Sequence, residues 1–560
     1  MKYRVLLKYT DLKENEDKKV KDSANYVAKP FDVLEKEARE AILKVQERYF
    51  KRMNKLNDNE RFAIYVNALT GAMDPHTNYM LPQDKKRFDE MMSGGFIGIG
   101  AGLFQTDEGN IKITSLVTGS PAWKTGKLKV EDIIYKVAQG DALPVEIEGM
   151  EIDDVIKLIR GKKGTEVRLT VKHQDGSSEV VPIVRDQVSS EETFAKSAII
   201  EKDHKKIGYI YLPEFYADFS GKNTGRRSGT DVLNEVEKLK AENVEGIILD
   251  LRNNGGGSLT DVVEMSGIFL GSGPVVQVRS NGDNITPLKS RASEPLFDGP
   301  LAIMINVGSA SASEILAAVM QDYKRAVVVG TTSFGKGTVQ NIVPLDQFVD
   351  ARVGRQILDA FNKAKKGESA DYDGIGSLKL TINKFYRVNG GSTQLKGVTP
   401  DIILPDAYEQ IENIGERKDP SALPWDKITA ARYPLWYEQP NIDFLKRKSE
   451  SRIQSDETFK LIRRTGDRLK KQQDNYVVPL SQIDYAKYLE ESKSITKELE
   501  DIEKKQPHNI TIFNPNIDMA KINVDTTSQN KNTEWLKNLK KDVYVYETSN
   551  IVIDMLNAKK

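Results

Sequence analysis

Three runs made up almost entirely of apolar residues, at 246–251, 301–307 and 326–330, constrain the fold of this chain more than any other feature. A strand buried on one face alternates apolar and polar residues, whereas a strand buried on both faces is apolar throughout. Stretches with the helical spacing of apolar residues lie between the runs, at 261–270 and 311–323. The order strand, helix, strand, helix, strand predicts an α/β core in which helices cover the sheet.

The rest of the chain differs from this core in pattern. With 560 residues the chain is too long for one hydrophobic core, so about three or four domains are expected. Near residue 93 a helical pattern gives way to short strand-like runs such as 167–171, with one amphipathic helix at 151–160. We therefore predict a multidomain α/β protein with four parts: a helical N-terminal region over 1–92, a small α+β module over 93–187, the core over 188–405, and a charged helical C-terminal region over 406–560.

Composition excludes several classes of function. Lys plus Arg equals Asp plus Glu at 82 each, so no net field favours nucleic acid or an anionic membrane as a partner. The absence of cysteine excludes disulfides, thiol catalysis and Cys-ligated zinc. The histidines do not have the spacing of metal ligands, so no metal site is predicted. They are His76, His173, His204 and His508.

The sequence contains no signal for a membrane or for export. No apolar run reaches about 18 residues, so no membrane-spanning helix is predicted. The first eight residues include the basic Lys2, Arg4 and Lys8, but their apolar stretch is interrupted before the ~7–15 residues of a signal-peptide core. As written, the chain is expected to have no export signal.

The turn at 307–316, between the second apolar run and the next helix, is a candidate site for a nucleophile. Its small residues let a substrate backbone approach, and the N–H groups and dipole of the new helix favour a developing oxyanion. Ser311 lies in this turn. The alternative is structural, because Ser311 and Glu314 also form a capping box, and serine is a preferred N-cap.

Lys336, which follows the third apolar run, is the candidate base. The sequence offers no plausible histidine near Ser311, and burial lowers the pKa of a lysine from ~10.4 by as much as ~3–5 units. Loops after neighbouring parallel strands leave the same edge of a sheet, so Ser311 and Lys336 are expected to meet. Gln340 is placed to accept a hydrogen bond from the lysine amine. The alternative is a surface lysine followed by a polar strand residue.

The segment from Gly330 to Lys336 also approaches the pattern of a phosphate-binding loop, which would indicate a nucleotidase. Two features argue against that interpretation. Gly337 stands where such a loop has the Ser or Thr that binds magnesium, and the β-branched residues after it predict a strand instead of a helix.

Two further glycine-rich segments are candidates for binding oxygen atoms. The turn at 250–257 ends in three glycines whose N–H groups can aim at one point, as an oxyanion hole requires; the alternative is an ordinary flexible turn. The second segment can present backbone amides to a peptide carboxylate, and the strand after it can pair with an extended tail. It lacks the third glycine and the acidic partner of a dinucleotide fingerprint. Its residues are Gly98, Ile99, Gly100 and Ala101.

Taken in order, these segments resemble the carboxyl-terminal processing proteases, also called tail-specific proteases, and in particular their long periplasmic bacterial branch. The resemblance spans roughly residues 70 to 430. Several motifs in one order are more specific than any one of them. The motifs are DPHT at 74–77, GSPA at 119–122, DII at 132–134, DLRNNGGG at 250–257, SASASE at 309–314, FGKGTVQ at 334–340 and FYRVNGGS at 385–392.

The resemblance implies a fold and a set of residue roles. The fold is a crotonase-like α/β protease core, preceded by an inserted PDZ domain and flanked by helical regions. One position departs from the pattern, because Glu131 stands where PDZ domains usually have glycine. The implied roles are Ser311 as nucleophile, Lys336 as general base, Gln340 as the residue that orients the lysine, and Ala312 with Gly257 or Gly256 as oxyanion-hole donors.

The implied function is a serine endopeptidase that needs no cofactor and selects proteins through apolar C-terminal tails, with an adaptor protein as a candidate partner. The resemblance also implies a periplasmic location and a longer chain from which an export signal has been removed. A tail-binding scaffold with a silent protease core is a second hypothesis, and the nucleotidase is a third.

Overall fold

The computed structural model describes residues 1–23, 25–106, 109–189, 193–218, 225–280, 284–364, 374–411, 414–474, 477–490, 493, 497 and 508–558. These residues form two compact units. The first contains 1–61, 97–188 and 472–501, and the second contains 62–96, 189–471 and 502–560. Four elements contain residues of both units: α3 (Asp58–Gly71), β2 (Gly95–Gly98), β9 (Asp186–Ser189) and α12 (Glu457–Asp474).

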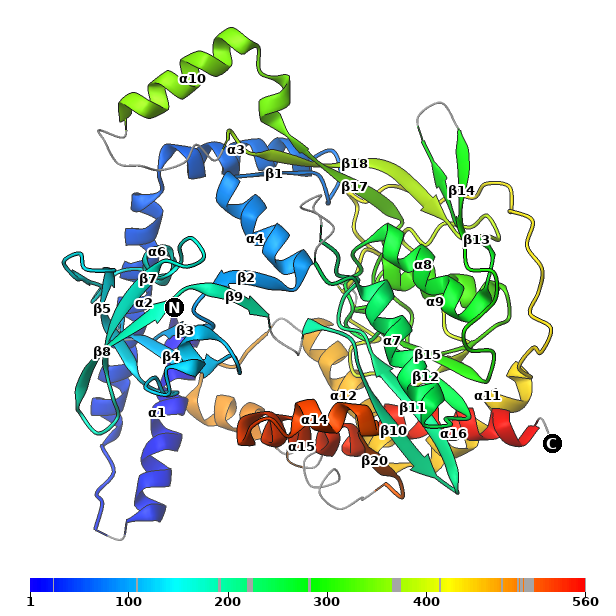
Figure 1. Ribbon diagram of the computed structural model, residues 1–560. Helices are drawn as coiled ribbons and strands as arrows, with labels where there is room; N and C mark the ends of the chain where they lie inside the picture. Colours follow the sequence, from blue (N-terminus) through cyan, green and yellow to red (C-terminus); the bar gives the residue numbers. More distant parts are fainter. Residues whose placement is uncertain are drawn as a thin grey trace. The chain divides into compact units, whose positions relative to one another are not determined.

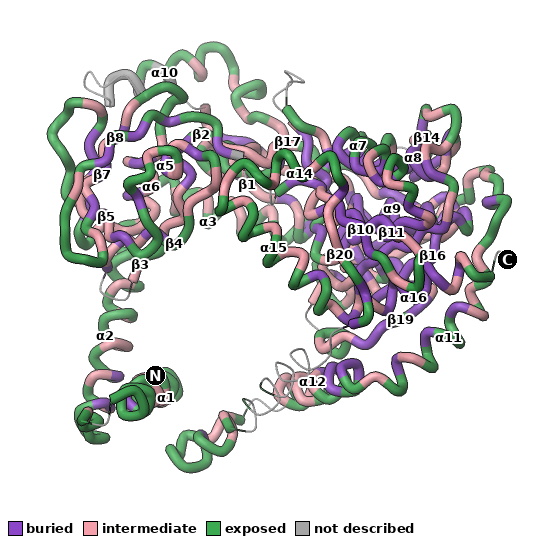
Figure 2. The backbone as a smooth tube through the Cα atoms, turned by 60° about the horizontal axis from the view of Figure 1, so that its bottom comes forward, coloured by how far each residue is buried: buried purple, intermediate pink, exposed green. Residues whose placement is uncertain are grey.

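The first unit combines two long helices with a small α+β module (Figure 1). Helices α1 (Lys2–Asp22) and α2 (Phe31–Lys55) pack together through Tyr9, Leu34 and Ala38, and are otherwise largely exposed (Figure 2). The other elements are β3 (Ala101–Gln105), β4 (Ile111–Leu116), α5 (Pro121–Lys124), β5 (Ile133–Gln139), β6 (Val145–Glu146), α6 (Ile152–Ile159), β7 (Glu166–Lys172) and β8 (Ser178–Val184).

The module's sheet has the strand order β3-β4-β5-β7-β8, with β6 paired to β5. Side chains along its strands alternate between the buried core and the more exposed face, as expected of strands that are buried on one face only. In β7, Val167, Leu169 and Val171 point into the core while their neighbours are more exposed. Helix α6 buries Val155 and Ile159 against the same core, which confirms the amphipathic helix predicted from the sequence.

The second unit is built on a seven-stranded sheet of order β19-β16-β15-β12-β11-β10-β20. Strands β11, β12, β15, β16 and β19 are parallel, while β10 and β20 are antiparallel to their neighbours. The predicted apolar runs are the central parallel strands. The strand bounds are β10 (Lys196–Lys202), β11 (Lys205–Tyr211), β12 (Gly246–Asp250), β15 (Leu301–Ile305), β16 (Val327–Gly330), β19 (Ile402–Ile403) and β20 (Thr511–Phe513).

Helices cover both faces of this sheet, as continuous apolar strands require (Figures 1 and 2). Side chains such as Leu249 and Ile303 pack against α7 (Ser228–Ala241), α8 (Leu259–Leu270) and α9 (Ala312–Asp322). Ile248 and Met304 point the other way, toward α15 (Thr526–Lys541) and α16 (Val543–Ala558). The remaining helices of the unit are α4 (Pro82–Ser93), α10 (Ala351–Ala364), α11 (Ile442–Ser455) and α14 (Met519–Ile522).

A second, antiparallel sheet of this unit has the order β1-β18-β13-β14, with β17 also paired to β18. Its strands come from distant parts of the chain, since the segment after residue 77 pairs with the one near residue 380. The bounds are β1 (Asn78–Met80), β13 (Gly273–Arg279), β14 (Ile285–Ser290), β17 (Thr338–Pro344) and β18 (Ser377–Tyr386).

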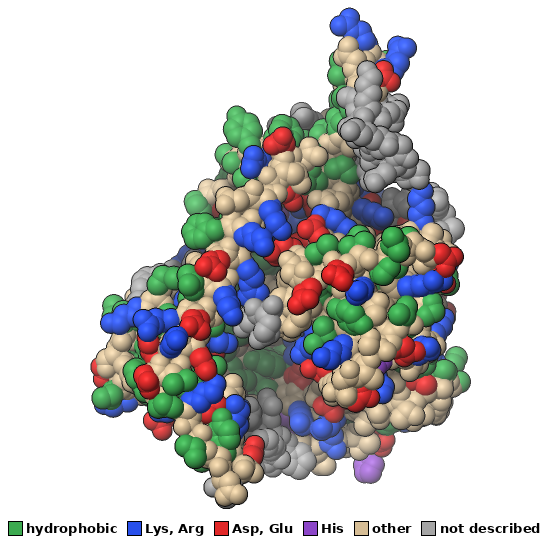
Figure 3. Space-filling view, turned by 90° about the vertical axis from the view of Figure 1, so that its left-hand side faces the viewer, with side chains coloured by type: hydrophobic (Ala, Val, Ile, Leu, Met, Phe, Trp, Pro, Cys, Tyr) green, Lys and Arg blue, Asp and Glu red, His purple; other side chains and the backbone are tan. Residues whose placement is uncertain are grey.

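The C-terminal region differs from the sequence prediction in two ways. The first described helix after residue 406 begins at Ile442, and β20 extends the core sheet by pairing with β10. Neither feature was predicted, because the region is rich in charged residues and the spacing of charged residues says little about where strands and helices begin. Basic and acidic side chains are interspersed on the face drawn in Figure 3, in line with the equal totals of 82.

None of the described helices is both long and apolar enough to cross a membrane. Within the described ranges, no group of three or more His, Asp or Glu side chains is arranged to hold a metal ion.

Candidate active site

Ser311 lies where β15 leads into α9, and it occupies the N-cap position of that helix. Its backbone is strained, with φ of 55° and ψ of −110°, a conformation that a non-glycine residue rarely adopts. Such strain persists only where the surroundings hold it, and it is concentrated at functional sites. The neighbours Ala310, Ala312 and Ser313 are buried, while Ser311 itself is half-buried. The hydroxyl therefore lies on a rigid turn at the sheet edge.

Glu314 ties this turn to the segment that contains Lys336. Its side chain is completely buried, and one carboxylate oxygen accepts both the Ser311 N–H, at 2.8 Å, and the Lys336 N–H, at 3.0 Å. The other oxygen accepts the Gly335 N–H at 2.7 Å and the Ser333 hydroxyl at 2.6 Å. From the sequence, Glu314 was predicted only to form a capping box with Ser311. The predicted capping box is present, and its Glu314 carboxylate also joins two loops.

Burial raises the pKa of Glu314 to about 7, and the hydrogen bonds from Ser333, Gly335, Ser311 and Lys336 oppose that rise. The carboxylate is the better acceptor for four donors, so the charged form matches the observed contacts.

Lys336 lies between β16 and β17, on the loop that leaves the sheet beside the Ser311 turn. Strands β15 and β16 are parallel neighbours, with Ile305 opposite Gly330, so both loops emerge at the same edge. Burial lowers the pKa of Lys336 to about 8, assisted by the positive charge of Lys379. Three carboxylates oppose the shift: Glu416, Glu314 and Asp74.

In the part of the chain that the structure describes, the Lys336 ammonium has no hydrogen-bond or ion-pair partner. No hydrogen bond joins it to the Ser311 hydroxyl or to the Gln340 side chain. Gln340 instead donates its Nε2 to Thr338 Oγ1, at 2.9 Å, and to Thr381 Oγ1, at 3.1 Å. The two loops are thus joined through Glu314 and the backbone, and the Ser311 hydroxyl and the Lys336 amine are not hydrogen-bonded to each other.

The glycine turn after β12 lies directly against Ser311. A Cβ atom added to Gly256, whose φ is +100°, would lie 2.7 Å from Ser311 Cβ and 3.1 Å from the Ala312 nitrogen. The Gly256 N–H is already bound to Asn254 Oδ1 at 2.9 Å. The N–H groups of Gly257 and Ala312 have no acceptor among the described residues. This difference favours Gly257 over Gly256 as the partner of Ala312 in an oxyanion hole.

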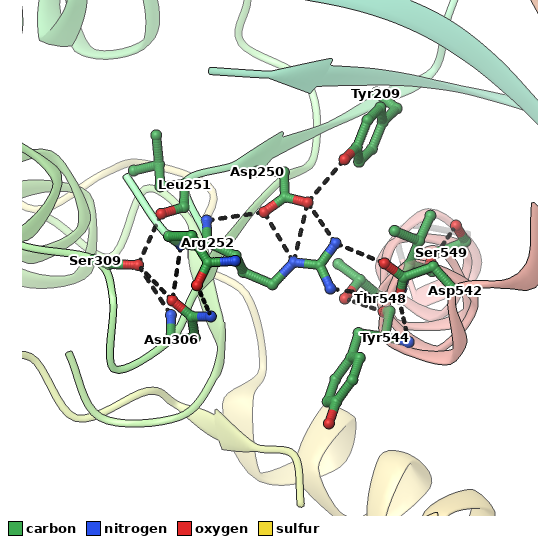
Figure 4. Close-up of polar contacts among 12 residues, drawn as sticks. Tyr209, Asp250, Leu251, Arg252, Asn306, Ser309, Asp542, Tyr544, Thr548 and Ser549 are labelled. Carbon is green, nitrogen blue, oxygen red and sulfur yellow. Dashed lines mark hydrogen bonds and ion pairs between the residues drawn. The ribbon is translucent and has the colours of Figure 1, made fainter. Parts of the chain in front are cut away.

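Arg252 anchors the start of this turn to the C-terminal region (Figure 4). It binds Asp250 at 2.6 Å on one side and Asp542, just before α16, at 2.8 Å on the other. Tyr209 donates its hydroxyl to the same Asp250 carboxylate at 2.8 Å. A second set of contacts holds Asn306, whose Oδ1 accepts the Asn253 N–H at 2.8 Å. These contacts of Arg252 and Asn306 were not predicted from the sequence.

The predicted tail-binding segment belongs to the first unit. Gly98, Ile99 and Gly100 are buried and Ala101 is half-buried, and the Ile99 and Gly100 carbonyls accept N–H groups from Ala122 and Val117, each at 2.8 Å. Strand β3, which follows, is at the end of the module's strand order. Its outer edge is therefore the place where an extended peptide could add as another strand.

The chain after Lys336 enters strand β17. A phosphate-binding loop needs a helix N-terminus there. The local structure therefore does not have the geometry of a nucleotide site.

Four family models match the chain. The model for peptidase family S41 matches 206–404, and a PDZ domain model matches 112–173. The tail specific protease N-terminal domain matches 1–83, and the C-terminal domain of tail specific protease matches 410–557.

Relatives with curated names include two bacterial proteases. The chain is 38% identical over 424 residues to a tail-specific protease of Haemophilus influenzae, and the match covers 74% of this chain and 57% of the relative. It is 33% identical over 402 residues to a probable CtpA-like serine protease of Staphylococcus haemolyticus, covering 70% of this chain and 69% of the relative. The chain spans less than two thirds of the first curated relatives it matches.

Among solved structures, the PDZ domain of a carboxy-terminal protease from Vibrio cholerae, in complex with a peptide, is 42% identical. That match covers 17% of this chain and 97% of the other, with a TM-score of 0.16.

Proposed function

The chain belongs to peptidase family S41, and from this premise we propose that it is a serine endopeptidase with Ser311 as nucleophile and Lys336 as general base. The observation that carries the proposal is the environment of Lys336. Its side chain is half-buried, its amine lacks a partner among the described residues, and burial lowers its pKa to about 8. A lysine in that state can accept a proton near neutral pH.

In the proposed mechanism, Ser311 attacks the carbonyl carbon of a peptide bond while neutral Lys336 takes the hydroxyl proton. The Ala312 and Gly257 N–H groups bind the oxyanion of the tetrahedral intermediate. Lys336 then gives the proton to the leaving amine, and the acyl-enzyme forms. A water molecule, deprotonated by Lys336, hydrolyses the ester and regenerates Ser311. The lysine must first turn toward the serine, since the two side chains are not hydrogen-bonded at rest.

Gln340 completes the proposed site as the residue that orients Lys336. Its Nε2 is bound to Thr338 and Thr381, which fixes the plane of the amide and leaves Oε1 as the acceptor for the lysine. No cofactor takes part in this chemistry.

The substrates we propose are proteins selected by an apolar C-terminal tail. The tail would pair with the outer edge of β3, and the backbone at Gly98–Ala101 would receive its carboxylate. Periplasmic location and delivery by an adaptor protein are further parts of the proposal. So is the division of the chain into domains at 1–92, 93–187, 188–405 and 406–560.

The chemistry is tested with a fluorophore–quencher peptide that ends in three apolar residues. Ser311→Ala and Lys336→Ala are expected to reduce turnover by at least about 10³-fold, because each removes a group that takes part in bond making. Thermal unfolding shows whether either variant is still folded. A folded Ser311→Ala variant that still cleaves the peptide would overturn the proposal.

Tail selection is tested with the same peptide carrying a C-terminal carboxamide. Loss of the carboxylate is expected to raise KM and leave kcat nearly unchanged, because the residues proposed to bind the carboxylate take no part in bond making. Binding of the free-acid peptide with no cleavage at any pH would instead support the tail-binding scaffold.

A further inference from the structure

The turn at 74–77 is a sequence motif to which the proposed mechanism gives no role. Asp74 and Thr77 are buried, and all four residues belong to the second unit. The Asp74 carboxylate accepts the N–H groups of His76, at 2.8 Å, and Thr77, at 3.2 Å, and it also binds the Thr77 hydroxyl. An aspartate that holds the backbone two and three residues ahead makes a rigid turn.

One chain of hydrogen bonds leads from this turn to Gln340. The Thr381 hydroxyl donates to Asp74 at 2.8 Å, and the Thr381 N–H donates to Thr77 Oγ1 at 3.1 Å. Thr381 Oγ1 in turn accepts Nε2 of Gln340 at 3.1 Å. Thr381 and Gln340 are opposite each other on β18 and β17, so the side-chain contact follows from the strand register. Asp74 thereby sets the orientation of the Gln340 amide.

A second chain leads from the same turn to the backbone beside Lys336. Nε2 of His76 binds one oxygen of the buried Glu416 carboxylate, and the other oxygen accepts Nε2 of Gln394 at 3.0 Å. Gln394 Oε1 accepts the Gly337 N–H at 2.6 Å. The Glu416 N–H also donates to the Phe334 carbonyl, at 2.9 Å. The backbone on both sides of Lys336 is therefore held by a network that ends at His76.

We propose that the turn at 74–77 is a positioning element for the base: Asp74 acts on Gln340 through Thr381, and His76 acts on Gly337 through Glu416 and Gln394. The inference rests on the proposed role of Lys336 as the base. Neither Asp74 nor His76 touches the reacting atoms in this scheme, so both are positioning residues. The motif is then part of the active site although it precedes Ser311 by more than two hundred residues.

The network also carries charges that act on the pKa of Lys336, an effect that a purely structural turn would not have. Although burial favours its neutral form, hydrogen bonds from Thr77, His76 and Thr381 hold the pKa of Asp74 below its ordinary value. Asp74 is thus an anion at neutral pH, and its charge raises the pKa of Lys336. The other charges that act on Lys336 are Lys379 on β18, Glu416 on the loop after β19, and Glu314 on α9.

The experiment compares Thr381→Val, which removes the hydroxyl between Asp74 and Gln340, with Thr381→Ser, which keeps it. Thr286→Val, on exposed strand β14 of the same sheet, is the matched control. Thr381→Val is expected to lower kcat about ten- to hundredfold with little change in KM, because a misplaced base slows proton transfer. Thr381→Ser and Thr286→Val are expected to stay within about twofold of the parent enzyme.

Asp74→Asn is the second variant, because it keeps the size of the side chain and one accepting oxygen and removes the charge. Loss of a neighbouring anion lowers the pKa of Lys336, so the rise of kcat/KM with pH is expected to move to lower pH. Lys379→Met removes a neighbouring cation and is expected to move the same rise to higher pH. The two opposite shifts also test the proposal if Thr381→Val proves unstable.

Two results would overturn the inference. One is a Thr381→Val enzyme with the kcat of the Thr286→Val control, and the other is an Asp74→Asn profile that coincides with the parent profile. In either case inactive Lys336→Ala and Ser311→Ala variants would leave the proposed protease function standing. An active Lys336→Ala variant would instead remove the base, and the positioning role would fall with it.

Discussion

The chemistry of Lys336 is set by its surroundings, since a free lysine is protonated at neutral pH. Burial and the charge of Lys379 lower its pKa to about 8, while Glu416, Glu314 and Asp74 act in the opposite direction. The neutral amine is the form that can take the Ser311 proton. Its fraction grows as the pH rises through about 8, so activity should grow over the same range.

Lys336→Arg is expected to be inactive at every pH, because a guanidinium with a pKa above about 12 cannot act as a base. The loss should exceed about 10²-fold in kcat, the lower limit for general-base catalysis. The parent kcat/KM is expected to rise between about pH 6.5 and about pH 9. Steady-state kinetics on the quenched peptide measure both effects. A flat parent profile, or cleavage by the arginine variant, would contradict the assignment of the base.

Glu131 shows the cost of a side chain in a left-handed backbone. The resemblance to PDZ domains indicates glycine at this position, and Glu131 adopts a φ of 78°. Its carboxylate also binds Lys112 at 2.8 Å on the surface. Glu131→Ala loses that ion pair and keeps the strain, whereas Glu131→Gly loses the ion pair and relieves the strain. The glycine variant should be more stable than the alanine variant by about 1 kcal/mol.

Urea unfolding of the two Glu131 variants under identical conditions measures this difference. Because both variants lack the ion pair, the comparison isolates the backbone term. An alanine variant as stable as the glycine variant would show that the turn is not strained.

Elements distant in sequence hold the glycine turn at 250–257. Arg252, two residues after the end of β12, binds Asp542, which precedes α16 (Figure 4). Asp542 Oδ1 also accepts the N–H groups of Tyr544 and Val545, at 2.9 and 3.1 Å. One carboxylate therefore stabilises the start of α16 and fixes Arg252.

Asp542→Ala should lower the free energy of unfolding by about 1–3 kcal/mol, because it removes a helix cap and a charged hydrogen bond. Glu534→Ala is the control, since Glu534 forms only an exposed pair with Lys537 on α15 and should change stability by less than about 0.5 kcal/mol. Chemical unfolding followed by circular dichroism measures both. Equal losses in the two variants would mean that neither the helix cap nor the Arg252 contact stabilises the fold.

At the scale of the whole molecule, the core sheet of the second unit depends on the end of the chain. Helices α15 and α16 cover one face of the sheet, and β20 pairs with its edge strand β10. Ile248, Met304 and Val552 are almost completely buried at this face. Without the cover, an apolar surface and an unpaired strand edge would meet water.

A chain that ends at residue 471 is expected to aggregate or to stay unfolded, because it lacks β20, α15 and α16. The control is a chain that lacks only residues 351–364, the segment of α10, since most of the described side chains of that helix are exposed. Size-exclusion chromatography and limited proteolysis distinguish an aggregated or unfolded chain from a folded monomer. A monomeric, protease-resistant 1–471 fragment would show that the sheet does not need its second helical layer.

The strands and helices of the core, and the loops that contain Ser311 and Lys336, could be predicted from sequence because each has a local cause. A strand buried on both faces must be apolar throughout, and parallel neighbours send their loops to one edge. The glycine turn beside Ser311 was found in the same way. The α/β class of the core follows from these local patterns, whereas the family was indicated by the resemblance of several motifs in one order.

Other contacts were decided by the tertiary structure alone. From sequence, Glu314 is predicted only as a helix cap. It links two loops because the loop after β16 brings the Gly335 and Lys336 N–H groups to its carboxylate. Asp74 and Thr381, or Arg252 and Asp542, are hundreds of residues apart, and nothing in either segment specifies the other. The chain by itself determined which elements form, since local burial and backbone preferences act over a few residues. Which polar groups meet was decided only by folding, because a buried donor takes whatever acceptor the packed elements bring within reach.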